Sequence, residues 1–471
     1  MRKAKIVCTL GPATDSVEVL SALIKAGMDV ARLNMSHGTH DEHAAQLTRL
    51  RQASAAAGKS VTVFADLQGP KIRLGTFAEP VTLVNGQRFT ITTDDVQGDA
   101  TRASTTLKSL TEDTHPGDAI LIDDGNLTLR VVEVTATDVI CDVVSGGPVS
   151  DHKGINLPGV PVSVPALSEK DADDLRWALA EDVDMVALSF VRSGHDIAPV
   201  HAIMDDFGAR LPVIAKIEKP QAVDALEDVV DAFDAIMVAR GDLGVEMPFE
   251  DVPLVQKRII TASRTWAKPV IVATQMLESM ITASRPTRAE ASDVANAVMD
   301  GADAVMLSGE TSVGAYPVES VRAMDRIVRA VEAGGTDEIT KIEWDPHTTS
   351  GVAAWGAARM ARKLDVAAIV PFSYYGDTAR RVARLRPGTP IVCFTPLEST
   401  RRQLGLVWGL TTFVSKEHDI ESMLREMDAT LSRQKLAKPG DRVVVVYGKP
   451  LGTPSHTNTV YVHAVGQRNG K

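Results

Sequence analysis

Side chains of opposite charge follow two successive apolar runs near the middle of the chain. Lys216 and Glu218 are two residues apart, so on an extended strand their side chains point to the same face. Asp242 comes after the next apolar run, 235–239. Two carboxylates form a site that Mg²⁺ accepts, with substrate oxygens and water completing its coordination. With Lys216 as a second cation, this group suits phosphoryl transfer, in which positioning and charge neutralisation dominate. The plainer interpretation is a structural ion pair between Lys216 and Glu218.

Further polar residues follow other apolar runs, where strands are expected to end. One polar strand end has an ordinary explanation, because strand ends are solvated, but six of them in one fold favour a shared active site. Gly241 and Gly244 flank Asp242 and allow a tight turn that brings backbone N–H groups near an anion. The other residues are Arg32, Asn34, Ser36 and His37 after the second run, Asp66, Lys71 and Arg73 after the third, Arg240 after the sixth, Thr274 and Gln275 after the seventh, and Ser308 and Glu310 after the eighth.

Eight apolar runs predict the strands that position these residues. All but the third are followed by a helical stretch, the alternation typical of βα units. The third leads into a segment rich in β-branched residues and turns, which predicts an all-β insertion. About 245 residues remain outside it, close to the roughly 250 of a (β/α)₈ TIM barrel, whose active site lies at the carboxyl ends of the strands. An open doubly wound sheet is the alternative. The predicted strands are 5–10, 30–33, 61–65, 185–190, 213–217, 235–239, 270–273 and 304–307.

We predict an α/β protein of three domains. The (β/α)₈ barrel comprises 1–69 and 166–340, and an inserted β-barrel lid domain comprises 70–165. After a linker from Gly334 to Pro346, further βα units predict a C-terminal α/β domain over 346–471. The sequence AGKS at 57–60 is not a nucleotide P-loop, because a helix precedes Gly58 and a strand follows it, so Gly58 is a helix C-cap.

Composition limits the partners of this 471-residue chain. Its 50 basic and 61 acidic residues give a formal net charge of −11, which argues against nucleic acid as the main partner. No apolar run approaches the roughly 18 residues of a membrane helix, and the start of the chain does not resemble a signal peptide. Three widely spaced cysteines, Cys8, Cys141 and Cys393, fit neither a disulfide framework nor a zinc site. We therefore expect a cytoplasmic protein without a membrane partner.

Eight segments in this order resemble the pyruvate kinase family. The resemblance is specific over residues 1–330 and weaker over the C-terminal domain. It implies transfer of the phosphoryl group of phosphoenolpyruvate to ADP, which gives pyruvate and ATP in glycolysis, and a homotetramer. The segments are KIVCTLGP (5–12), ARLNMSHG (31–38), GINLPG (154–159), KIE (216–218), MVARGDLGVE (237–246), ATQML (273–277), RPTRAE (285–290) and MLSGE (306–310).

The resemblance also implies roles for individual residues. Lys216 stabilises the phosphoryl group during its transfer, and Thr274 and Ser308 orient the water or hydroxyl chain that protonates the enolate. The lid closes over the cleft and excludes water. By the same resemblance, Glu218 and Asp242 bind Mg²⁺, with Mn²⁺ as an alternative, and Arg32 and Arg73 bind the phosphates of substrate and nucleotide. The pyruvate end of the substrate is held by Gly241, Asp242 and Thr274. The nucleotide is contacted by Asn34, His37 and Lys153.

The sequence after the third strand departs from the commonest pattern of the family. Many members carry Glu where this chain has Lys71, and use K⁺ held partly by the positions of Asn34, Ser36 and Asp66. Lysine there resembles the K⁺-independent branch, because a tethered ammonium supplies the same positive charge. We therefore expect no K⁺ requirement. The alternative is that Lys71 is only a surface lysine of the lid.

The C-terminal domain contains a candidate phosphate loop. Ser373 to Thr378 follows a strand and opens a helix with Arg380, a geometry suited to the phosphate of a sugar or nucleotide effector. An ordinary N-capped helix is an equally good interpretation.

Two other functions fit parts of the pattern. A barrel lyase or aldolase shares the paired carboxylates but does not need Lys216 together with Arg73 and a lid lysine. A metabolite-sensing barrel without catalysis does not need Lys216, Glu218, Asp242 and Thr274 intact. Turnover that depends on ADP distinguishes all three.

Overall fold

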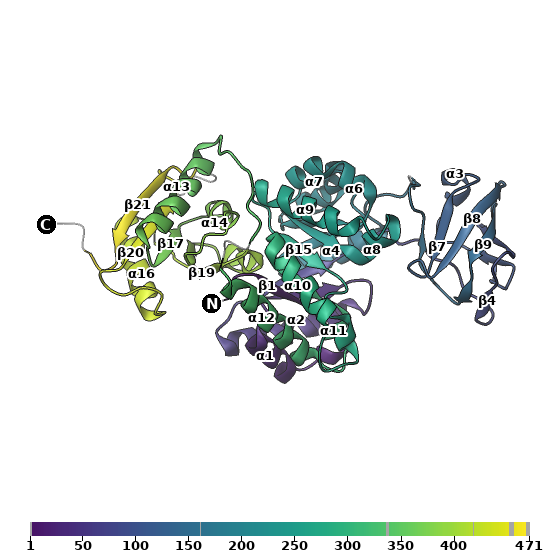
Figure 1. Ribbon diagram of the computed structural model, residues 1–471, viewed down its shortest axis with the longest axis horizontal. Coiled ribbons are helices and arrows are strands. Elements are labelled where there is room, and N and C mark those ends of the chain that lie inside the picture. Colours follow the sequence, from purple (N-terminus) through teal and green to yellow (C-terminus); the bar gives the residue numbers. More distant parts are fainter. Residues whose placement is uncertain (1, 161, 336–338, 418, 452–455, 468–471) are drawn as a thin grey trace.

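The computed structural model describes residues 2–160, 162–335, 339–417, 419–451 and 456–467. Three bodies lie in a row along its longest axis (Figure 1): an inserted β-rich segment at one end, a barrel in the middle and a C-terminal α/β segment at the other end. Residues 336–338 of the predicted linker lie outside the described residues.

Eight parallel strands form a closed barrel, in the order β1-β16-β15-β14-β13-β12-β3-β2. This confirms the predicted barrel and excludes the open sheet. Every predicted strand is present, and the largest difference is at β12, which ends at Leu188 rather than at Phe190. The strands are β1 (Lys5–Thr9), β2 (Val30–Asn34), β3 (Thr62–Asp66), β12 (Met185–Leu188), β13 (Val213–Ile217), β14 (Ala235–Ala239), β15 (Val270–Ala273) and β16 (Ala304–Leu307).

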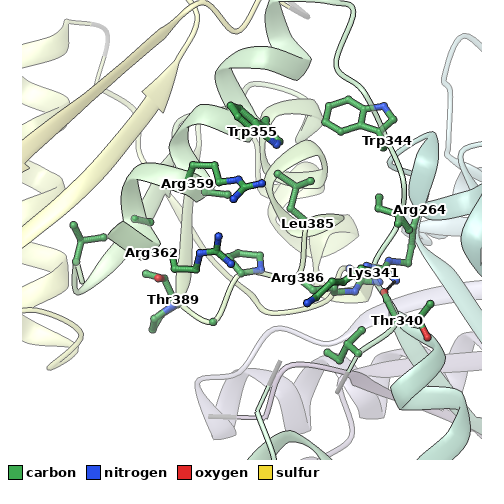
Figure 2. Close-up of a pocket in the computed structure, with 18 of the residues that line it drawn as sticks. Arg264, Thr340, Lys341, Trp344, Trp355, Arg359, Arg362, Leu385, Arg386 and Thr389 are labelled. Carbon is green, nitrogen blue, oxygen red and sulfur yellow. Dashed lines mark hydrogen bonds between the residues drawn. The ribbon is translucent and has the colours of Figure 1, made fainter. Parts of the chain in front are cut away.

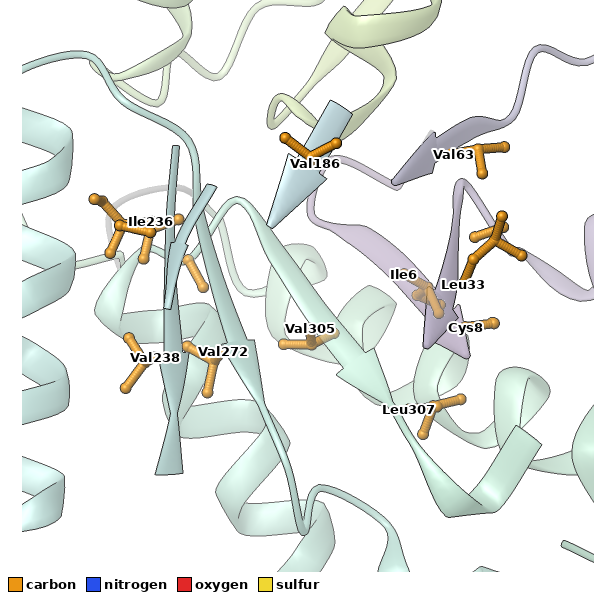
Figure 3. Close-up of a cluster of buried hydrophobic side chains, with 14 of the residues drawn as sticks. Ile6, Cys8, Leu33, Val63, Val186, Ile236, Val238, Val272, Val305 and Leu307 are labelled. Atoms are coloured by element: carbon orange, nitrogen blue, oxygen red, sulfur yellow. The ribbon is translucent and has the colours of Figure 1, made fainter. Parts of the chain in front are cut away.

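Alternate residues of each barrel strand face opposite sides, and both sides are packed. Ile6 and Cys8 belong to the hydrophobic cluster between the strands and the surrounding helices (Figure 3), whereas Val7 belongs to the cluster inside the barrel. On β13 the outward residues are Ala215 and Ile217, which places Lys216 on the inward side. The barrel interior is therefore a packed core, and its polar residues gather where the strands end.

The barrel strands are joined by helices that form the outer layer. The helix α2 ends as predicted, because Gly58 adopts the left-handed conformation (φ 61°) and caps it. The helices are α1 (Val17–Ala26), α2 (His40–Ala57), α4 (Glu169–Ala180), α5 (Ala198–Phe207), α6 (Pro220–Asp224), α7 (Leu226–Ala232), α8 (Arg240–Glu246), α9 (Val252–Thr265), α10 (Arg288–Asp300), α11 (Gly309–Ser312) and α12 (Pro317–Ala333).

The segment inserted after β3 is β-rich and has a hydrophobic cluster of its own. A six-stranded sheet has the order β11-β7-β8-β9-β5-β6, and β4 pairs separately with β10. The edge strands of this sheet are two and three residues long. Residues 73–74 join the two edges through isolated bridges, Arg73 to Gly154 and Leu74 to Thr105, which supports the predicted β-barrel lid; the lid stays a prediction. The elements are β4 (Val81–Leu83), β5 (Arg88–Thr92), β6 (Arg102–Ser104), α3 (Leu110–Asp113), β7 (Ala119–Ile122), β8 (Leu127–Val134), β9 (Asp138–Ser145), β10 (Gly147–Val149) and β11 (Ile155–Asn156).

The C-terminal segment contains a five-stranded sheet in the order β19-β18-β17-β20-β21, in which β21 runs antiparallel to β20. Hydrophobic clusters pack on its two faces. Most residues of each hydrophobic cluster come from one of the three bodies, which supports the predicted domain limits; these limits stay a prediction. The elements are α13 (Thr349–Leu364), β17 (Ala368–Pro371), α14 (Asp377–Ala383), β18 (Ile391–Thr395), α15 (Glu398–Gln403), η5 (Leu404–Leu406), β19 (Leu410–Val414), α16 (Ile420–Arg433), β20 (Arg442–Tyr447) and β21 (Thr459–Ala464).

The C-terminal segment closes the amino-terminal end of the barrel, which the sequence pattern did not predict. Leu406 is fully buried within the cluster inside the barrel. The Trp408 backbone N–H donates to Asp303 Oδ1 at 3.0 Å. Arg386 pairs with the same carboxylate, with Nη2 2.7 Å from Asp303 Oδ2. The bottom of the barrel is thus sealed by apolar packing and a buried ion pair.

Across the described ranges, no helix combines the length and apolar character needed to cross a membrane.

Candidate active site

A ring of polar side chains occupies the carboxyl end of the barrel, and Lys216 is at its centre. Lys216 Nζ donates to Ser189 Oγ at 2.7 Å, and it lies 2.8 Å from Glu218 Oε1 and 3.3 Å from Asp66 Oδ1. Burial alone would lower the pKa of Lys216, but Asp66 and Glu218 outweigh burial and raise it above its usual value. The lysine is therefore held as a buried cation.

Asp66 connects Lys216 to Arg32. Arg32 Nε donates to Asp66 Oδ2 at 2.6 Å, and Arg32 Nη1 donates to Thr9 Oγ1 at 3.2 Å. Burial would raise the pKa of Asp66, but the charges of Lys216 and Arg32 outweigh it and hold this pKa below its usual value. Two cations thus share one buried carboxylate at the mouth of the barrel.

Glu218 and Asp242 are the two carboxylates predicted to bind the metal, and their charges interact. Glu218 Oε2 accepts a hydrogen bond from the Phe190 backbone N–H at 2.7 Å. Burial raises the pKa of Glu218 to about 7; the charge of Lys216 opposes this rise, and that of Asp242 adds to it. The described residues contain no cluster of three or more His, Cys, Asp or Glu side chains arranged for a metal. Mg²⁺ often takes only one or two protein carboxylates beside substrate oxygens, so this donor set fits it.

The turns after β14 and β15 are held together through Thr274. Its Oγ1 accepts a hydrogen bond from the Gly241 backbone N–H at 2.7 Å. Arg240 Nη2 donates to the Thr274 carbonyl at 2.7 Å, and Arg240 Nη1 donates to Asp293 Oδ1 at 2.7 Å. Thr274 has a backbone φ of 69°, an uncommon value that concentrates at functional turns. This hydrogen bond fixes the backbone at Gly241, the residue before Asp242.

Ser308 has a side-chain hydroxyl without a hydrogen-bond partner in the described part of the chain, although this atom is buried. The Ser308 backbone N–H donates to Glu310 Oε2 at 2.7 Å, and the Leu277 N–H donates to Glu310 Oε1 at 3.0 Å. Burial raises the pKa of Glu310. The carboxylate thus orients the end of β16, while the hydroxyl stays available.

The residues after β2 form a small polar group beside Asp66. Asn34 pairs in register with Asp66 across β2 and β3. Asn34 Nδ2 lies 3.2 Å from His37 Nδ1, and Asn34 Oδ1 accepts from the Ser36 N–H at 3.3 Å.

Lys71, Arg73 and Lys153 lie on the inserted segment. Arg73 Nη1 donates to the His152 carbonyl at 3.1 Å, and Lys153 Nζ donates to Asp123 Oδ1 at 2.8 Å, so both are bonded within that segment. Lys71 lines a cavity of about 30 Å³ together with Asp242. Within the described ranges, Lys71 Nζ forms no hydrogen bond or ion pair. Only Lys71 of these three is therefore placed beside a predicted barrel site residue.

The candidate effector loop borders a cavity of about 310 Å³ in the C-terminal segment. Ser373 and Thr378 line this cavity, and Thr378 Oγ1 lies 2.6 Å from Thr457 Oγ1. Arg380 is not among the lining residues, and its Nη1 donates to the Tyr375 carbonyl at 3.2 Å.

Two residues of the ring were missed by the sequence analysis. Thr9 and Ser189 come at the ends of β1 and β12, and they hold Arg32 and Lys216. The same rule of polar residues at strand ends could have found both. Ser189 was hidden because the fourth strand was predicted to continue to Phe190.

Comparisons with known proteins agree with this fold. Residues 1–321 match the family model "Pyruvate kinase, barrel domain", and residues 352–463 match "Pyruvate kinase, alpha/beta domain". Pyruvate kinases of Corynebacterium glutamicum and Mycobacterium tuberculosis are each 55% identical to the chain, over 468 and 470 residues. These alignments cover 99% of this chain and 98% and 99% of the relatives. A crystal structure of a pyruvate kinase from Cryptosporidium parvum has a TM-score of 0.92 at 34% identity, covering 98% of this chain and 96% of that one.

The fold, the ring of charged residues and these matches define a barrel enzyme of the phosphotransferase class. The chain belongs to the pyruvate kinase family. The family's reaction has phosphoenolpyruvate and ADP as substrates and pyruvate and ATP as products, and it generally uses Mg²⁺. Family membership therefore removes the lyase and sensor alternatives.

Proposed function

We propose that the chain is a pyruvate kinase that depends on Mg²⁺ (or Mn²⁺), needs no K⁺, and acts in the cytoplasm with Lys216 as its central cation. The observation that carries this proposal is the environment of Lys216, which is buried between Asp66 and Glu218 and beside Arg32. A cation fixed in advance stabilises the charge that moves during phosphoryl transfer without further reorganisation. Free, buried cysteines support a reducing compartment.

Glu218 and Asp242 would hold the divalent cation. Their two carboxylates leave room for substrate oxygens and water, as Mg²⁺ requires. When bound, the ion would neutralise charge on the phosphate and on the enolate oxygen. Thr274 positions this site from the neighbouring turn, because its hydroxyl oxygen accepts a hydrogen bond from the Gly241 N–H.

The remaining barrel residues take roles at the two ends of phosphoenolpyruvate. Arg32 is oriented by Asp66 and Thr9 and would bind the phosphate. Gly241, Asp242 and Thr274 would hold the pyruvate end. Ser308 is a candidate for orienting the proton donor to the enolate, since its buried hydroxyl has no protein partner in the described part of the chain.

The nucleotide would bind between the barrel and the inserted segment, which we propose acts as a lid. Asn34 and His37 contribute from β2, and Arg73 and Lys153 contribute from the lid. Because Arg73 and Lys153 are bonded within the inserted segment, binding of ADP would require them to exchange His152 and Asp123 for phosphate. Closure of the lid would then exclude water from the transfer.

Lys71 would replace K⁺ as the monovalent cation. It lines the same small cavity as Asp242, and its ammonium group has no protein partner among the described residues. Asp66, one of the positions that would help to hold K⁺, is already engaged by Arg32 and Lys216. Both observations favour a site that needs no added K⁺.

Pyruvate formation from phosphoenolpyruvate and ADP with Mg²⁺, with and without K⁺ at matched ionic strength, tests this proposal. We expect equal turnover in both conditions. Turnover only with K⁺ would retain the kinase and reject Lys71 as the substitute. No turnover in either condition, from folded protein with common effectors supplied, would reject the proposed function.

A Lys71→Glu variant should become responsive to K⁺, because the substitution removes the ammonium group and adds a carboxylate. The matched control is Lys108→Glu, at an exposed lysine of the same inserted segment that pairs with Asp95. This control should stay indifferent to K⁺. An active Lys71→Glu enzyme that is also indifferent to K⁺ would contradict the role of Lys71.

We further propose that the cavity beside Ser373 and Thr378, with Arg380 on the following helix, binds a phosphorylated sugar or nucleotide effector and that the enzyme is a homotetramer. The cavity supports the first proposal, and family membership supports the second. Activation kinetics of a Thr378→Val variant and light scattering test them. An effector response that does not change in this variant, or a particle of monomer mass, would overturn the respective proposal.

A further inference from the structure

A buried carboxylate near the proposed metal site connects three parts of the molecule. Glu246 is the last residue of α8, the short helix that carries Asp242 one turn earlier. Glu246 Oε1 accepts a hydrogen bond from Lys219 Nζ at 2.5 Å and another from Asn156 Nδ2 at 2.8 Å. Lys219 directly follows Glu218 just past the end of β13, and Asn156 belongs to β11 of the inserted segment. Glu246 therefore joins both metal-binding elements to the base of the lid.

The ion pair between Lys219 and Glu246 is largely withdrawn from water. The side chain of Glu246 is 2% exposed and that of Lys219 is 13% exposed. The Lys219 ammonium also lies 5.7 Å from the centre of the Phe190 ring. Loss of one partner of a buried pair leaves the other as an uncompensated charge, which is strongly unfavourable. The position of the Lys219 ammonium is therefore set by Glu246.

Lys219 and Asp242 line the same cavity, of about 30 Å³, at the base of the lid. A cavity of this size has room for about two water molecules. Its other charged lining residues are Lys71 and Arg192, so Asp242 is the single carboxylate among three cations. Arg192 is paired with the carboxylate four residues further along the chain, and Lys219 is paired with Glu246. Two of the three cations are thus neutralised by carboxylates other than Asp242.

The Asp242 carboxylate itself forms no hydrogen bond or ion pair with the residues that the structure describes. Its oxygens are therefore available to a divalent cation, as the proposed metal site requires. An ammonium that shares a small cavity with a free carboxylate is attracted to it. Lys219 without its partner would pair with Asp242 and compete with the metal.

We propose that Glu246 is a positioning residue of the metal site, which holds the Lys219 ammonium so that Asp242 stays free for the divalent cation. Because Glu218 and Asp242 are themselves proposed metal ligands, this role rests on the proposed function. Glu246 acts through Lys219 rather than as a ligand of the metal.

Mn²⁺ binding to the full chain, followed through the electron paramagnetic resonance signal of the free ion, tests this role without turnover. In Glu246→Gln the amide keeps an acceptor for Asn156 but leaves Lys219 without a negative partner. We expect Mn²⁺ to bind about tenfold more weakly, at the lower end of the 10–100-fold loss that follows removal of a supporting contact of a metal site. Wild-type affinity in this variant would overturn the role of Glu246.

Removal of Lys219 distinguishes this role from a merely structural one. Adding Lys219→Met to Glu246→Gln removes the competing ammonium, so the affinity for Mn²⁺ should return close to that of the wild type. Lys219→Met alone should bind Mn²⁺ at least as tightly as the wild type. The Mg²⁺ concentration for half-maximal activity should follow the same order. A double variant that binds as weakly as Glu246→Gln, or weakened binding in Lys219→Met, would contradict the proposal.

Two control variants leave the pair between Lys219 and Glu246 intact. Asn156→Ala removes only the other partner of Glu246. Asp300→Asn removes a buried carboxylate that also receives one lysine and one amide side chain, both from α9. Both variants should bind Mn²⁺ as the wild type does, and circular dichroism verifies folding. A loss in Asp300→Asn equal to that in Glu246→Gln would reject the proposal in favour of a general effect of lost buried charge.

Glu218→Gln separates failure of this role from failure of the proposed function. It removes a proposed ligand and should weaken Mn²⁺ binding more than Glu246→Gln does. If Mn²⁺ does not bind the wild type, or binds Glu218→Gln with wild-type affinity, the proposed metal site is wrong and the role of Glu246 is rejected with it. Weak binding in Glu218→Gln beside wild-type affinity in Glu246→Gln would reject only the role of Glu246.

Discussion

Lys5 and Lys216 are both buried lysines of the barrel, but they lie at its opposite ends. Lys216 is at the upper end, where the strands have their carboxyl ends, and Lys5 is at the lower end, where the strands begin. Lys216 is near the end of β13, with Glu218 and Asp66 within 3.3 Å of its Nζ. Lys5 begins β1, and its Nζ donates to the carbonyl of Leu410 at 2.9 Å. The pKa of Lys216 is raised by its carboxylates, whereas burial lowers the pKa of Lys5 to about 8.

The difference shows that burial alone does not determine the protonation state of a lysine. Carboxylates in contact with the amine keep the charge at the carboxyl end of the barrel, where phosphoryl transfer needs a cation. A carbonyl at the other end accepts a hydrogen bond but compensates little charge. Arg264 extends the comparison, because it also lies at the lower end, donates to carbonyls and has a lowered pKa.

The largest expected effect on stability is at Asp303, the buried carboxylate that pairs with Arg386 at the lower end. An Asp303→Asn substitution leaves Arg386 as an uncompensated buried cation. We expect the free energy of unfolding, measured by urea denaturation, to fall by about 3–5 kcal/mol. If the loss is as small as that of an exposed pair, the lower end does not depend on this carboxylate.

The matched control is Asp205→Asn. Asp205 pairs with Arg210 at 2.6 Å, but both side chains are about half exposed or more. Its substitution should change the free energy of unfolding by no more than about 1 kcal/mol.

At the upper end, Glu218→Gln tests whether the carboxylates also serve a metal. Changes in the supporting contacts of a metal site cost 10–100-fold in affinity, so loss of a direct ligand should raise the Mg²⁺ concentration for half-maximal activity more than about tenfold. Glu310→Gln removes another buried carboxylate of the same ring and should keep the wild-type Mg²⁺ requirement. An unchanged requirement in Glu218→Gln would remove Glu218 from the metal site.

Much of the upper end could be predicted from the sequence, because it depends on local patterns. Apolar runs fixed the eight strands to within two residues, and polar residues at strand ends identified Lys216 and Glu218. Thr9 and Ser189 are hydroxyl residues that strands commonly contain, so neither stood out. Their importance comes from the closed barrel, which brings Ser189 of one strand end to Lys216 of the next.

The lower end could not be predicted in this way. Leu406 enters the barrel core from a segment about 100 residues after the last barrel strand, and nothing in its local sequence distinguishes it from a residue of the C-terminal core. The cavity between the barrel and the C-terminal segment (Figure 2) has the same origin, since Arg264 and Arg362 line it from different bodies. The joining of the two edges of the inserted sheet through 73–74 depends likewise on pairing between residues that are distant in the sequence.

A further expected effect is a pH dependence of stability from Lys5. Its pKa is about 8 in the folded chain and near 10.5 when unfolded, so between these values the unfolded chain binds more protons. Stability should therefore rise with pH across this window, with a slope of at most about 1.4 kcal/mol per unit, and be insensitive to Lys5 below it. Thermal melts of wild type and Lys5→Met should diverge from pH 8 to 10; parallel curves would contradict the lowered pKa.

Turnover of Lys216→Met beside Lys5→Met compares the two buried lysines under one assay. With saturating phosphoenolpyruvate, ADP and Mg²⁺, Lys216→Met should lose at least about 100-fold in kcat, because it removes a preorganised charge from the transition state. Lys5→Met should keep wild-type turnover. Near-wild-type kcat in folded Lys216→Met, or an equal loss in both variants, would contradict the role of Lys216 as the cation of phosphoryl transfer.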